Sequence, residues 1–273
     1  MRVFKADGTR CTDPDPAMVM MAMFVRSADC VLDLGANVGL HTTMAARIVG
    51  PEGVVVSVEA SNETVEVLKR NVSHRPWTPS VRVLHAAVFD VSGAGVRIPK
   101  HRTGDNTVIR SIAATSDDPR EHHVVPTITV DDIVARSKLD RLRMIKIDIE
   151  GAEEHALRGA ARTLSSLKPI IVIEVQKGNA PWWAVPHPRV LQILDRLEHL
   201  LRSFGYGRLF LIPTANNVND FVAAHPDNPL ADPANAIASM TEARKQAVRL
   251  LGSEIEYKHG VFRHYMVTRS ETS

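Results

Sequence analysis

Three carboxylates stand where short, mainly apolar runs of residues end: Glu59, Asp148 and Glu174. Such runs are typical of buried parallel strands, and open α/β sheets place their chemistry at the carboxyl ends of those strands. A carboxylate in that position can accept hydrogen bonds from hydroxyl groups or take a proton from a reacting group. We therefore expect the functional site at this edge of a sheet.

A turn of small residues comes before these acids and is suited to contact a ligand. It covers residues 33–39, reads D-L-G-A-N-V-G and follows an apolar run. Gly35 and Gly39 let the backbone turn sharply and let a ligand come close to it, and Asn37 is of a type that tolerates a positive φ. A P-loop requires Lys-Ser/Thr after its last glycine and a dinucleotide fingerprint reads G-x-G-x-x-G, and the chain has neither.

The turn and Glu59 together favour a nucleoside ligand without a pyrophosphate. Glu59 ends the second strand about 20 residues later, an offset that suits an acid binding both ribose hydroxyls. We predict S-adenosylmethionine as the ligand; an ordinary βαβ unit with incidental acids is the alternative. Small residues at the end of the third strand leave room for an adenine ring, although close packing explains them equally well. The predicted contacts are Asp33, Gly35, Ala36, Asn37, Gly39, Glu59, Ala60, Ala86, Asn106 and Asp148.

Alternating strands and helices must position these residues. The apolar runs predict strands over residues 31–34, 54–59, 81–85, 144–148 and 170–174, and helices over 61–72 and from 150 onward. Because side chains alternate along a strand, Lys146 and Asp148 share one face. Glu153 and Glu154 are expected only to open a helix, whose dipole favours acids there.

The helical period disappears between residues 89 and 129, where short strands over 91–98 and 124–129 predict a β-hairpin beside the cofactor site. Its polar loop offers Asp105 and Asn106 as further contacts. Three histidines of this stretch are interpreted as solvated loop residues rather than metal ligands: His101, His122 and His123.

Two further stretches flank this core. Residues 17–25 are apolar but too few for a membrane span, so we expect a helix at the sheet edge that starts near Asp13 or Asp15. After residue 176, a proline-rich loop with Trp182 and Trp183 is expected to cover the acceptor. The remaining predicted segments are an irregular surface excursion over 213–235, a helix over 236–251 and a last strand over 261–268.

Composition sets loose bounds on partners and location. The chain has 273 residues, is 44% hydrophobic and carries a net charge of +2. These values exclude membrane and fibrous classes and give no case for nucleic acid or a membrane surface as partner. Cys11 and Cys30 are too few for a disulfide framework, so we expect a cytoplasmic protein.

Five segments, in their order and spacing, resemble the FkbM-type methyltransferases: residues 31–39, Glu59, 127–132, 145–153 and 173–175. The run D-I-E-G-A-E over 148–153 is the most specific of them. The resemblance implies a class I methyltransferase (Rossmann-like) α/β fold, S-adenosylmethionine as methyl donor, and a hydroxyl of a sugar, polyketide or related small metabolite as acceptor. By position, residues 35–39, Glu59 and Asp148 would be donor-site residues.

We therefore expect one methyltransferase domain with a mostly parallel sheet of about seven strands, a β-hairpin insertion and a C-terminal excursion over 213–258. Its expected parts are an N-terminal helical segment (1–26), a donor-binding core (27–176) and an acceptor lid with the last strands (177–273).

In a class I methyltransferase sheet the strands that end in Asp148 and Glu174 are adjacent, so these acids should lie close together. One of them, tuned by Lys146 or His41, can act as general base on the acceptor hydroxyl. Alternatively, the pair holds Mg²⁺, which lowers the pKa of that hydroxyl. A third interpretation is that Glu174 only caps a helix while Asp148 holds the donor's amino group. The catalytic candidates are Asp148, Glu174, Lys146 and His41.

Two rival functions stay open from the sequence alone. A NAD(P)-type dinucleotide-dependent oxidoreductase is disfavoured by the glycine pattern. A non-catalytic S-adenosylmethionine-binding protein would require the acids at the strand ends to be idle. A homodimer is also left open.

Overall fold

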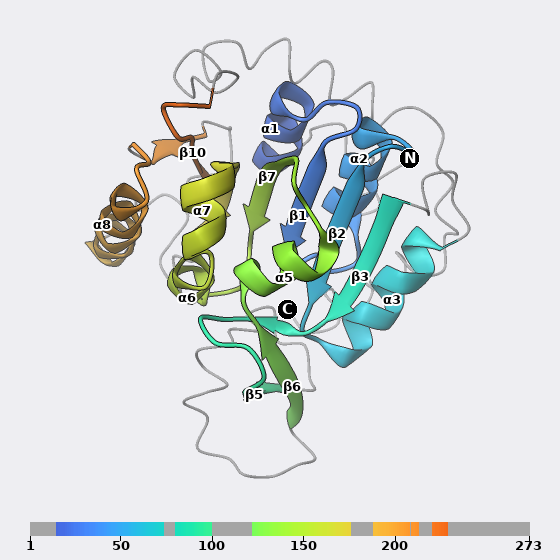
Figure 1. The fold of residues 1–273 in the computed structure, drawn as a ribbon. Coiled ribbons are helices and arrows are strands. Elements are labelled where there is room, and N and C mark those ends of the chain that lie inside the picture. Colours follow the sequence, from blue (N-terminus) through green and yellow to red (C-terminus); the bar gives the residue numbers. More distant parts are fainter. Residues whose placement is uncertain are drawn as a thin grey trace.

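The computed structural model describes residues 15–73, 80–99, 122–175, 188–207, 209–212 and 220–228. These residues form a large sheet of seven strands, in the order β3-β2-β1-β7-β8-β10-β9, and a small sheet in the order β4-β6-β5 (Figure 1). The strands of the large sheet are β1 (Cys30–Leu34), β2 (Val54–Glu59), β3 (Val81–His85), β7 (Leu142–Ile147), β8 (Ile170–Glu174), β9 (Phe210–Leu211) and β10 (Asp220–Ala223). Those of the small sheet are β4 (Ala87–Val88), β5 (Gly95–Pro99) and β6 (His122–Ile128).

The large sheet is mostly parallel, as predicted. The strands β3, β2, β1, β7 and β8 run in one direction, and β10 is antiparallel to both of its neighbours, β8 and β9. All residues of β1 are buried, as expected of a central strand that is covered on both faces. The carboxyl ends of the five parallel strands therefore meet at one edge, which we call the carboxyl edge.

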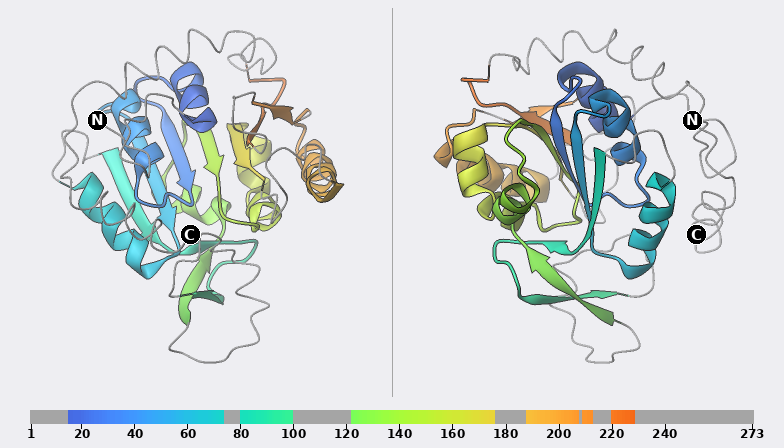
Figure 2. Two further views of the ribbon diagram at one scale, coloured as in Figure 1. Left: turned by 180° about the vertical axis from the view of Figure 1, so that it is seen from behind. Right: turned by 45° about the vertical axis from the view of Figure 1, so that its right-hand side comes forward.

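Helices cover both faces of this sheet (Figures 1 and 2). They are α1 (Pro16–Phe24), α2 (Leu40–Val49) and α3 (Asn62–Val72) on one face, and α5 (Val130–Ser137), α6 (Glu153–Arg158), α7 (Ala161–Leu167) and α8 (Pro188–Ser203) on the other. Because strand side chains alternate, β1 sends Val31 into the core beneath α1 and α2, and Leu32 into the core beneath the second group of helices. This is the doubly covered arrangement of an open α/β fold.

The helix α1 packs on a face of the sheet, not at its edge as the sequence predicted. Eight of its nine residues are buried, and it contacts α2, β7 and β8. A helix that is apolar all round requires cover on all sides, which the middle of a sheet face provides. Asp15 caps the helix by accepting a hydrogen bond from the amide of Met18 at 2.9 Å, whereas Asp13 lies outside the described residues.

The predicted hairpin is confirmed, since β5 and β6 pair in antiparallel fashion, and β6 also pairs in parallel with β4. The small sheet lies beyond the carboxyl edge of the large sheet (Figures 1 and 2). The interpretation of His122 and His123 as loop residues was wrong: both belong to β6 and are partly buried, because β6 passes next to the end of β2. His101, Asp105 and Asn106 lie outside the described residues.

The irregular excursion predicted over 213–235 contains a strand. Residues Asp220–Ala223 form β10, and all of them are buried. The strand is short, yet Phe221 joins the core on one face of the sheet and Val222 the core on the other. Two tryptophans of the predicted loop and two predicted segments lie outside the described residues: Trp182, Trp183, the helix over 236–251 and the strand over 261–268.

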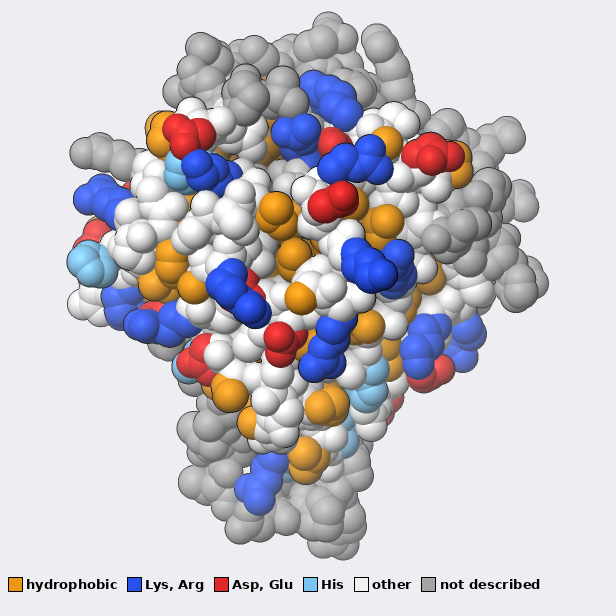
Figure 3. Space-filling model, in the orientation of Figure 1, with side chains coloured by type: hydrophobic (Ala, Val, Ile, Leu, Met, Phe, Trp, Pro, Cys, Tyr) orange, Lys and Arg blue, Asp and Glu red, His pale blue; other side chains and the backbone are white. Residues whose placement is uncertain are grey.

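The length of the helices and the charge of the surface can be compared with what a membrane or a charged partner requires. Among the described residues, none of the helices is long and apolar enough to cross a membrane. On the face that carries α5, Lys and Arg side chains are interspersed with acidic and apolar ones (Figure 3), in keeping with the net charge of +2.

Candidate active site

The turn between β1 and α2 has the backbone that its sequence predicts. Gly35, Asn37 and Gly39 have φ angles of 77°, 50° and 91°. The amides of Gly35 and Ala36 both donate to the carbonyl of Val58 at 3.0 Å, which ties the turn to the end of β2. The turn thus lies at the carboxyl edge with its main chain fixed.

Close contacts within the protein explain why glycine is required in this turn. A Cβ atom at Gly35 would lie 1.8 Å from the carbonyl oxygen of Asp148, and one at Gly39 would lie 2.5 Å from Cδ1 of Leu68. The glycines therefore let the turn pack against the end of β7 and against α3. Approach of a ligand to the same backbone stays a prediction.

Glu59 is fixed by the backbone on both sides of it. Its Oε2 accepts a hydrogen bond from the amide of Asn37 at 2.9 Å, and its Oε1 accepts one from the amide of Ser61 at 2.8 Å. An ionised carboxylate can accept about four hydrogen bonds, so this arrangement is compatible with ribose hydroxyls as additional donors. The oxygen atoms of Glu59 are acceptors of the kind that nucleoside hydroxyl groups require, and two backbone amides orient them.

Lys146 is the buried cation of the site. Its side chain is 4% exposed, and its Nζ lies 3.0 Å from Oδ2 of Asp148, 3.7 Å from Oδ1 of Asp33 and 3.4 Å from the carbonyl oxygen of Gly35. Burial acts to lower the pKa of Lys146, but the charges of Asp148 and Asp33 outweigh it and raise this pKa above its ordinary value. Lys146 therefore stays protonated and cannot itself act as a base near neutral pH.

Asp33 forms an ion pair with Lys146 at the end of β1. Its side chain is fully buried, and its Oδ2 accepts a hydrogen bond of 2.6 Å from the hydroxyl of Thr42, which also lies 2.8 Å from the hydroxyl of Ser57. The prediction that Lys146 and Asp148 share one face is confirmed by their ion pair. Direct contact of Asp33 with a donor stays a prediction, although the contacts that the structure shows are internal.

Glu174 ends β8, which is the neighbour of β7 in the sheet. Burial and the negative charges of Asp148 and Asp220 raise the pKa of Glu174 to about 8, and the positive charge of Lys146 opposes this shift. Ile147 pairs with Ile173 in the β7–β8 ladder, so the residues that follow them, Asp148 and Glu174, stand at the ends of neighbouring strands. A carboxyl group that titrates near neutral pH can take up a proton during a reaction.

Asp220 is a member of this acidic group that sequence reasoning missed. It lies directly opposite Glu174 in the β10–β8 ladder and is 5% exposed. The sequence signal was weak, because only the short apolar run after Asp220 distinguishes β10 from the polar residues before it.

His41 lies at the start of α2, and its imidazole pairs with another acid. Its Nε2 is 2.8 Å from Oδ2 of Asp15, the capping residue of α1. Burial acts to lower the pKa of His41, but the charge of Asp15 outweighs it and the pKa is raised. The pair joins α1 to α2, and a role of His41 in tuning Asp148 or Glu174 stays a prediction.

Two histidines that the sequence did not mark as site residues converge next to Glu59. Nε2 of His85 and Nε2 of His123 lie 3.1 Å and 3.3 Å from the carbonyl oxygen of Ala60. The small sheet thus touches the predicted donor site through His123. Ala86 is buried, and its amide donates to the carbonyl of Glu59 at 3.2 Å, while Asn106 lies outside the described residues.

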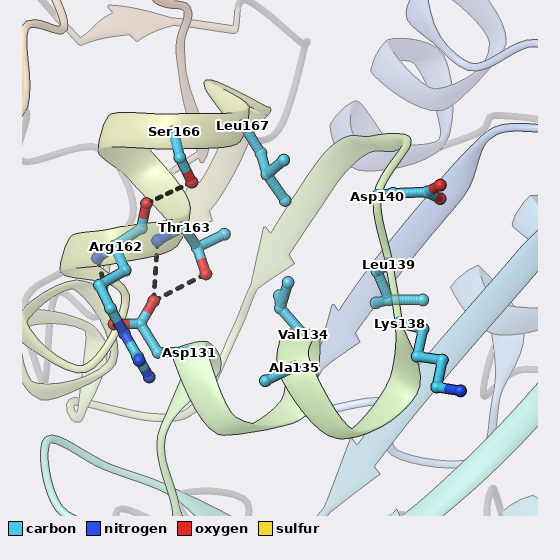
Figure 4. Close-up of a pocket in the computed structure, with 10 residues that line it drawn as sticks. All are labelled: Asp131, Val134, Ala135, Lys138, Leu139, Asp140, Arg162, Thr163, Ser166 and Leu167. Carbon is cyan, nitrogen blue, oxygen red and sulfur yellow. Dashed lines mark hydrogen bonds and ion pairs between the residues drawn. The ribbon is translucent and has the colours of Figure 1, made fainter.

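A metal centre and a surface cavity are two other kinds of ligand site. Within the described ranges, no group of three or more His, Cys, Asp or Glu side chains has the geometry to hold a metal ion. Mg²⁺ on Asp148 and Glu174 would use only two such side chains and stays a prediction. A cavity of about 420 Å³ lies between α5 and α7, toward the amino end of β7 and thus away from the carboxyl edge. Its polar groups bind one another: Asp131 accepts from the amide and hydroxyl of Thr163, and Ser166 donates to the carbonyl of Arg162 (Figure 4).

Comparison with known proteins places the chain in a family. The model of the methyltransferase FkbM domain matches residues 33–206, which contain the turn and all the strand-end acids named above except Asp220. A protein-L-isoaspartate O-methyltransferase of Archaeoglobus fulgidus is 37% identical over 67 residues, 24% of this chain and 31% of that protein. Hexuronic acid methyltransferase AglP of Haloferax volcanii is 24% identical over 155 residues, 56% of this chain and 58% of that protein.

A solved structure supports the same fold. Methyltransferase FkbM from Methylobacillus flagellatus KT matches with a TM-score of 0.51 and 17% identity, over 78% of this chain and 48% of that chain. The chain spans less than two thirds of the length of each of these three relatives. Because the family model covers more than half of the residues, this chain belongs to the methyltransferase FkbM domain family and has the class I methyltransferase fold.

Proposed function

We propose that this protein is an S-adenosylmethionine-dependent O-methyltransferase that acts on a hydroxyl group of a small acceptor, first of all a sugar. The observation that carries the proposal is the position of Glu174 at the carboxyl end of β8, next to the strand that leads into the Lys146–Asp148 ion pair. The raised pKa of Glu174, about 8, supports it. A relative named for hexuronic acid supports a sugar as acceptor. Polyketide alcohols and related metabolites are the other acceptors compatible with the family.

The donor would be held by the turn over residues 35–39 and by Glu59. The backbone of the turn is fixed by hydrogen bonds to Val58, and the Glu59 carboxylate is oriented by two amides, so neither has to reorganise when the donor binds. When bound, S-adenosylmethionine supplies a methyl group activated by a sulfonium charge. Asp148, held by Lys146, would bind the donor's amino group or act on the acceptor.

Glu174 would be the general base. It accepts the proton of the acceptor hydroxyl and leaves the oxygen with the electron pair that forms the new bond. A base is most effective when its pKa lies near the working pH, and burial together with the charges of Asp148 and Asp220 brings Glu174 into that range. Lys146 fixes Asp148 and moderates this shift, because its positive charge lowers the pKa of Glu174.

Incubation of the purified protein with methyl-labelled S-adenosylmethionine and a panel of glycosides, uronic acids and polyketide-type alcohols tests this function. We expect a methyl ether from at least one acceptor, and calorimetric binding of S-adenosylmethionine but not of NAD(H). Binding of NAD(H) alone would favour the oxidoreductase. Donor binding without turnover of any acceptor would favour the non-catalytic alternative.

The same assay separates the general base from a metal. A rate that EDTA leaves unchanged is expected if Glu174 acts as the base. Activity that EDTA abolishes and Mg²⁺ restores would instead favour metal coordination of the acceptor oxygen.

A further inference from the structure

The segment that joins β7 to α6 has an unusual backbone. Glu150 and Gly151 are consecutive residues with φ angles of 56° and 105°. A positive φ is costly for a residue with a side chain, by roughly 1–2 kcal/mol, so surrounding contacts must hold Glu150 in this conformation. Asp148 lies two residues before this turn, and its carbonyl oxygen packs against Gly35.

Glu153 contacts this turn through its side chain. Its Oε1 accepts a hydrogen bond from the amide of Gly151 at 2.8 Å, and the residue is only 4% exposed. Ala152, the residue that precedes α6, has no side chain able to cap the helix. Burial of a carboxyl group costs free energy unless the group is hydrogen-bonded. The burial of Glu153 next to the Glu150–Gly151 turn therefore indicates a specific role.

The adjacent acid provides a contrast within the same helical turn. Glu154 also opens α6, but it binds Arg158 at 2.7 Å and Arg196 at 3.2 Å in exposed ion pairs. Two glutamates in succession thus serve different purposes, since Glu154 contacts the neighbouring helix α8 and Glu153 points back to the turn.

We propose that Glu153 is a positioning residue for methyl transfer: its carboxyl group clamps the Glu150–Gly151 turn and thereby fixes Asp148 against the Gly35 turn. This inference rests on the proposed function, because Asp148 is assigned to the reaction there. The clamp requires only a hydrogen-bond acceptor at the length of a glutamate side chain.

An uncharged acceptor should therefore replace Glu153. Burial, aided by the charge of Asp148 and opposed by the hydrogen bond from Gly151, raises the pKa of Glu153 to about 7. The site consequently favours the neutral acid over the carboxylate, and glutamine has the same length with an acceptor oxygen in the same place. Leucine fills a similar volume but cannot accept the hydrogen bond.

The experiment compares Glu153→Gln and Glu153→Leu with the matched controls Glu154→Gln and Glu154→Leu. We expect Glu153→Leu to lower kcat by about 10- to 100-fold, the scale of a misplaced group, while both KM values stay within about threefold. Glu153→Gln and both controls should retain kcat within about threefold. If Glu153→Leu fails to fold, Glu153→Asp replaces it, because its carboxyl group is one methylene too short to reach the Gly151 amide.

A second measurement does not depend on turnover. Hydrogen exchange at the Gly151 amide should accelerate at least tenfold in Glu153→Leu or Glu153→Asp, and remain slow in Glu153→Gln. If no acceptor is ever methylated, the proposed function fails, while the exchange pattern still decides whether the clamp exists. Unchanged exchange in the leucine and aspartate variants, unchanged kcat in them, or an equal loss of kcat in Glu153→Gln would overturn the inference.

Discussion

Lys146 is the residue around which the charges of the site are arranged. It is buried between Asp33 and Asp148 and donates to the carbonyl of Gly35, so one ammonium group joins β1, the glycine turn and the end of β7. A buried charge is tolerated when it is paired and hydrogen-bonded, whereas Glu174, at the end of the neighbouring strand, has a raised pKa. The site thus contains a fixed ion pair, Lys146–Asp148, and a separate carboxyl group, Glu174, that titrates near neutral pH.

Replacement of Glu174 tests its role as base. In the wild-type protein the rate should rise with pH through about 8, because the base must lose its proton before it can accept another. Glu174→Gln should lower kcat by at least about 100-fold and remove this rise. The measurement is kcat/KM for the best acceptor of the panel against pH, because this ratio reports the pKa of the protein before the acceptor binds.

A charge change next to Glu174 provides the control. Asp220→Asn removes a negative charge that raises the pKa of Glu174, so the rise in rate should move to lower pH while turnover persists. Full activity of Glu174→Gln, or a pH profile that Asp220→Asn leaves in place, would contradict the assignment of the base.

Glu59 is expected to contribute to donor affinity. Charge-assisted hydrogen bonds to two ribose hydroxyls contribute on the order of 1.5–3 kcal/mol, so Glu59→Ala should weaken S-adenosylmethionine binding by roughly 10- to 100-fold. Calorimetric titration measures the effect, and Glu63→Ala, an exposed acid in the first turn of α3, is the control. Unaltered donor affinity in a folded Glu59→Ala protein would show that this acid only orders the backbone of Asn37 and Ser61.

At the scale of elements, the strands with the strongest local signal were predicted from the sequence. Continuous apolar runs identified β1, β2, β7 and β8, and the acids at three of their ends therefore lie at one edge as expected. The positions of two elements, α1 and β10, could not be predicted from the sequence. The position of α1 depends on which sheet surface lacks cover, and β10 depends on pairing with a strand far away in the chain, so neither follows from local periodicity.

The same limit explains the site residues that were missed. Asp220 reaches Glu174 through the β10–β8 ladder, His123 reaches Ala60 through the hairpin, and Asp15 reaches His41 through the packing of two helices. Each contact joins residues from separate elements. Residues 33–39, by contrast, form a turn whose conformation is local, and its sequence was sufficient to predict it.

The packing of the glycine turn against the end of β7 predicts how a substitution in the turn affects stability. Gly35→Ala would combine a positive φ with a Cβ only 1.8 Å from the carbonyl oxygen of Asp148, so the turn and the end of β7 must separate. Gly93 is the matched control, because its φ is 84° but an added Cβ would meet nothing within 4 Å. Thermal unfolding should show a loss of roughly 1–2 kcal/mol for Gly93→Ala and more than about 3 kcal/mol for Gly35→Ala.

Donor binding separates these two glycine variants as well. Gly35→Ala should weaken S-adenosylmethionine binding, whereas Gly93→Ala should leave it unchanged. Equal stability losses in the two proteins would mean that the contact between the turn and β7 relaxes without cost.

For the whole molecule, the buried acids make stability depend on pH in an unusual direction. The ordinary pKa of a glutamate is 4.5, whereas the folded protein raises that of Glu153 to about 7 and that of Glu174 to about 8. Between the ordinary pKa of 4.5 and the raised pKa of each acid, the folded state binds more protons than the unfolded chain. The stability of the fold therefore falls as pH rises through this range. His41 acts in the same direction, because its raised pKa contributes stability below 6.5 that is lost at higher pH.

The melting temperature should therefore fall between about pH 4.5 and pH 8, and two substitutions should reduce that fall. In the double variant Glu153→Gln, Glu174→Gln, neutral glutamine side chains replace the two acids that ionise in the folded protein at high pH. At pH 9 its Tm should therefore exceed that of the wild type by at least about 3 °C. A shift of this size corresponds to roughly 1 kcal/mol of stability in a domain of this size. At pH 4 the two proteins should differ little, since both acids are then protonated in the fold. The control pair Glu63→Gln, Glu154→Gln, whose acids are not buried, should retain the wild-type dependence. An undiminished fall of Tm in the double variant would show that these two carboxyl groups do not govern the stability of the fold at alkaline pH.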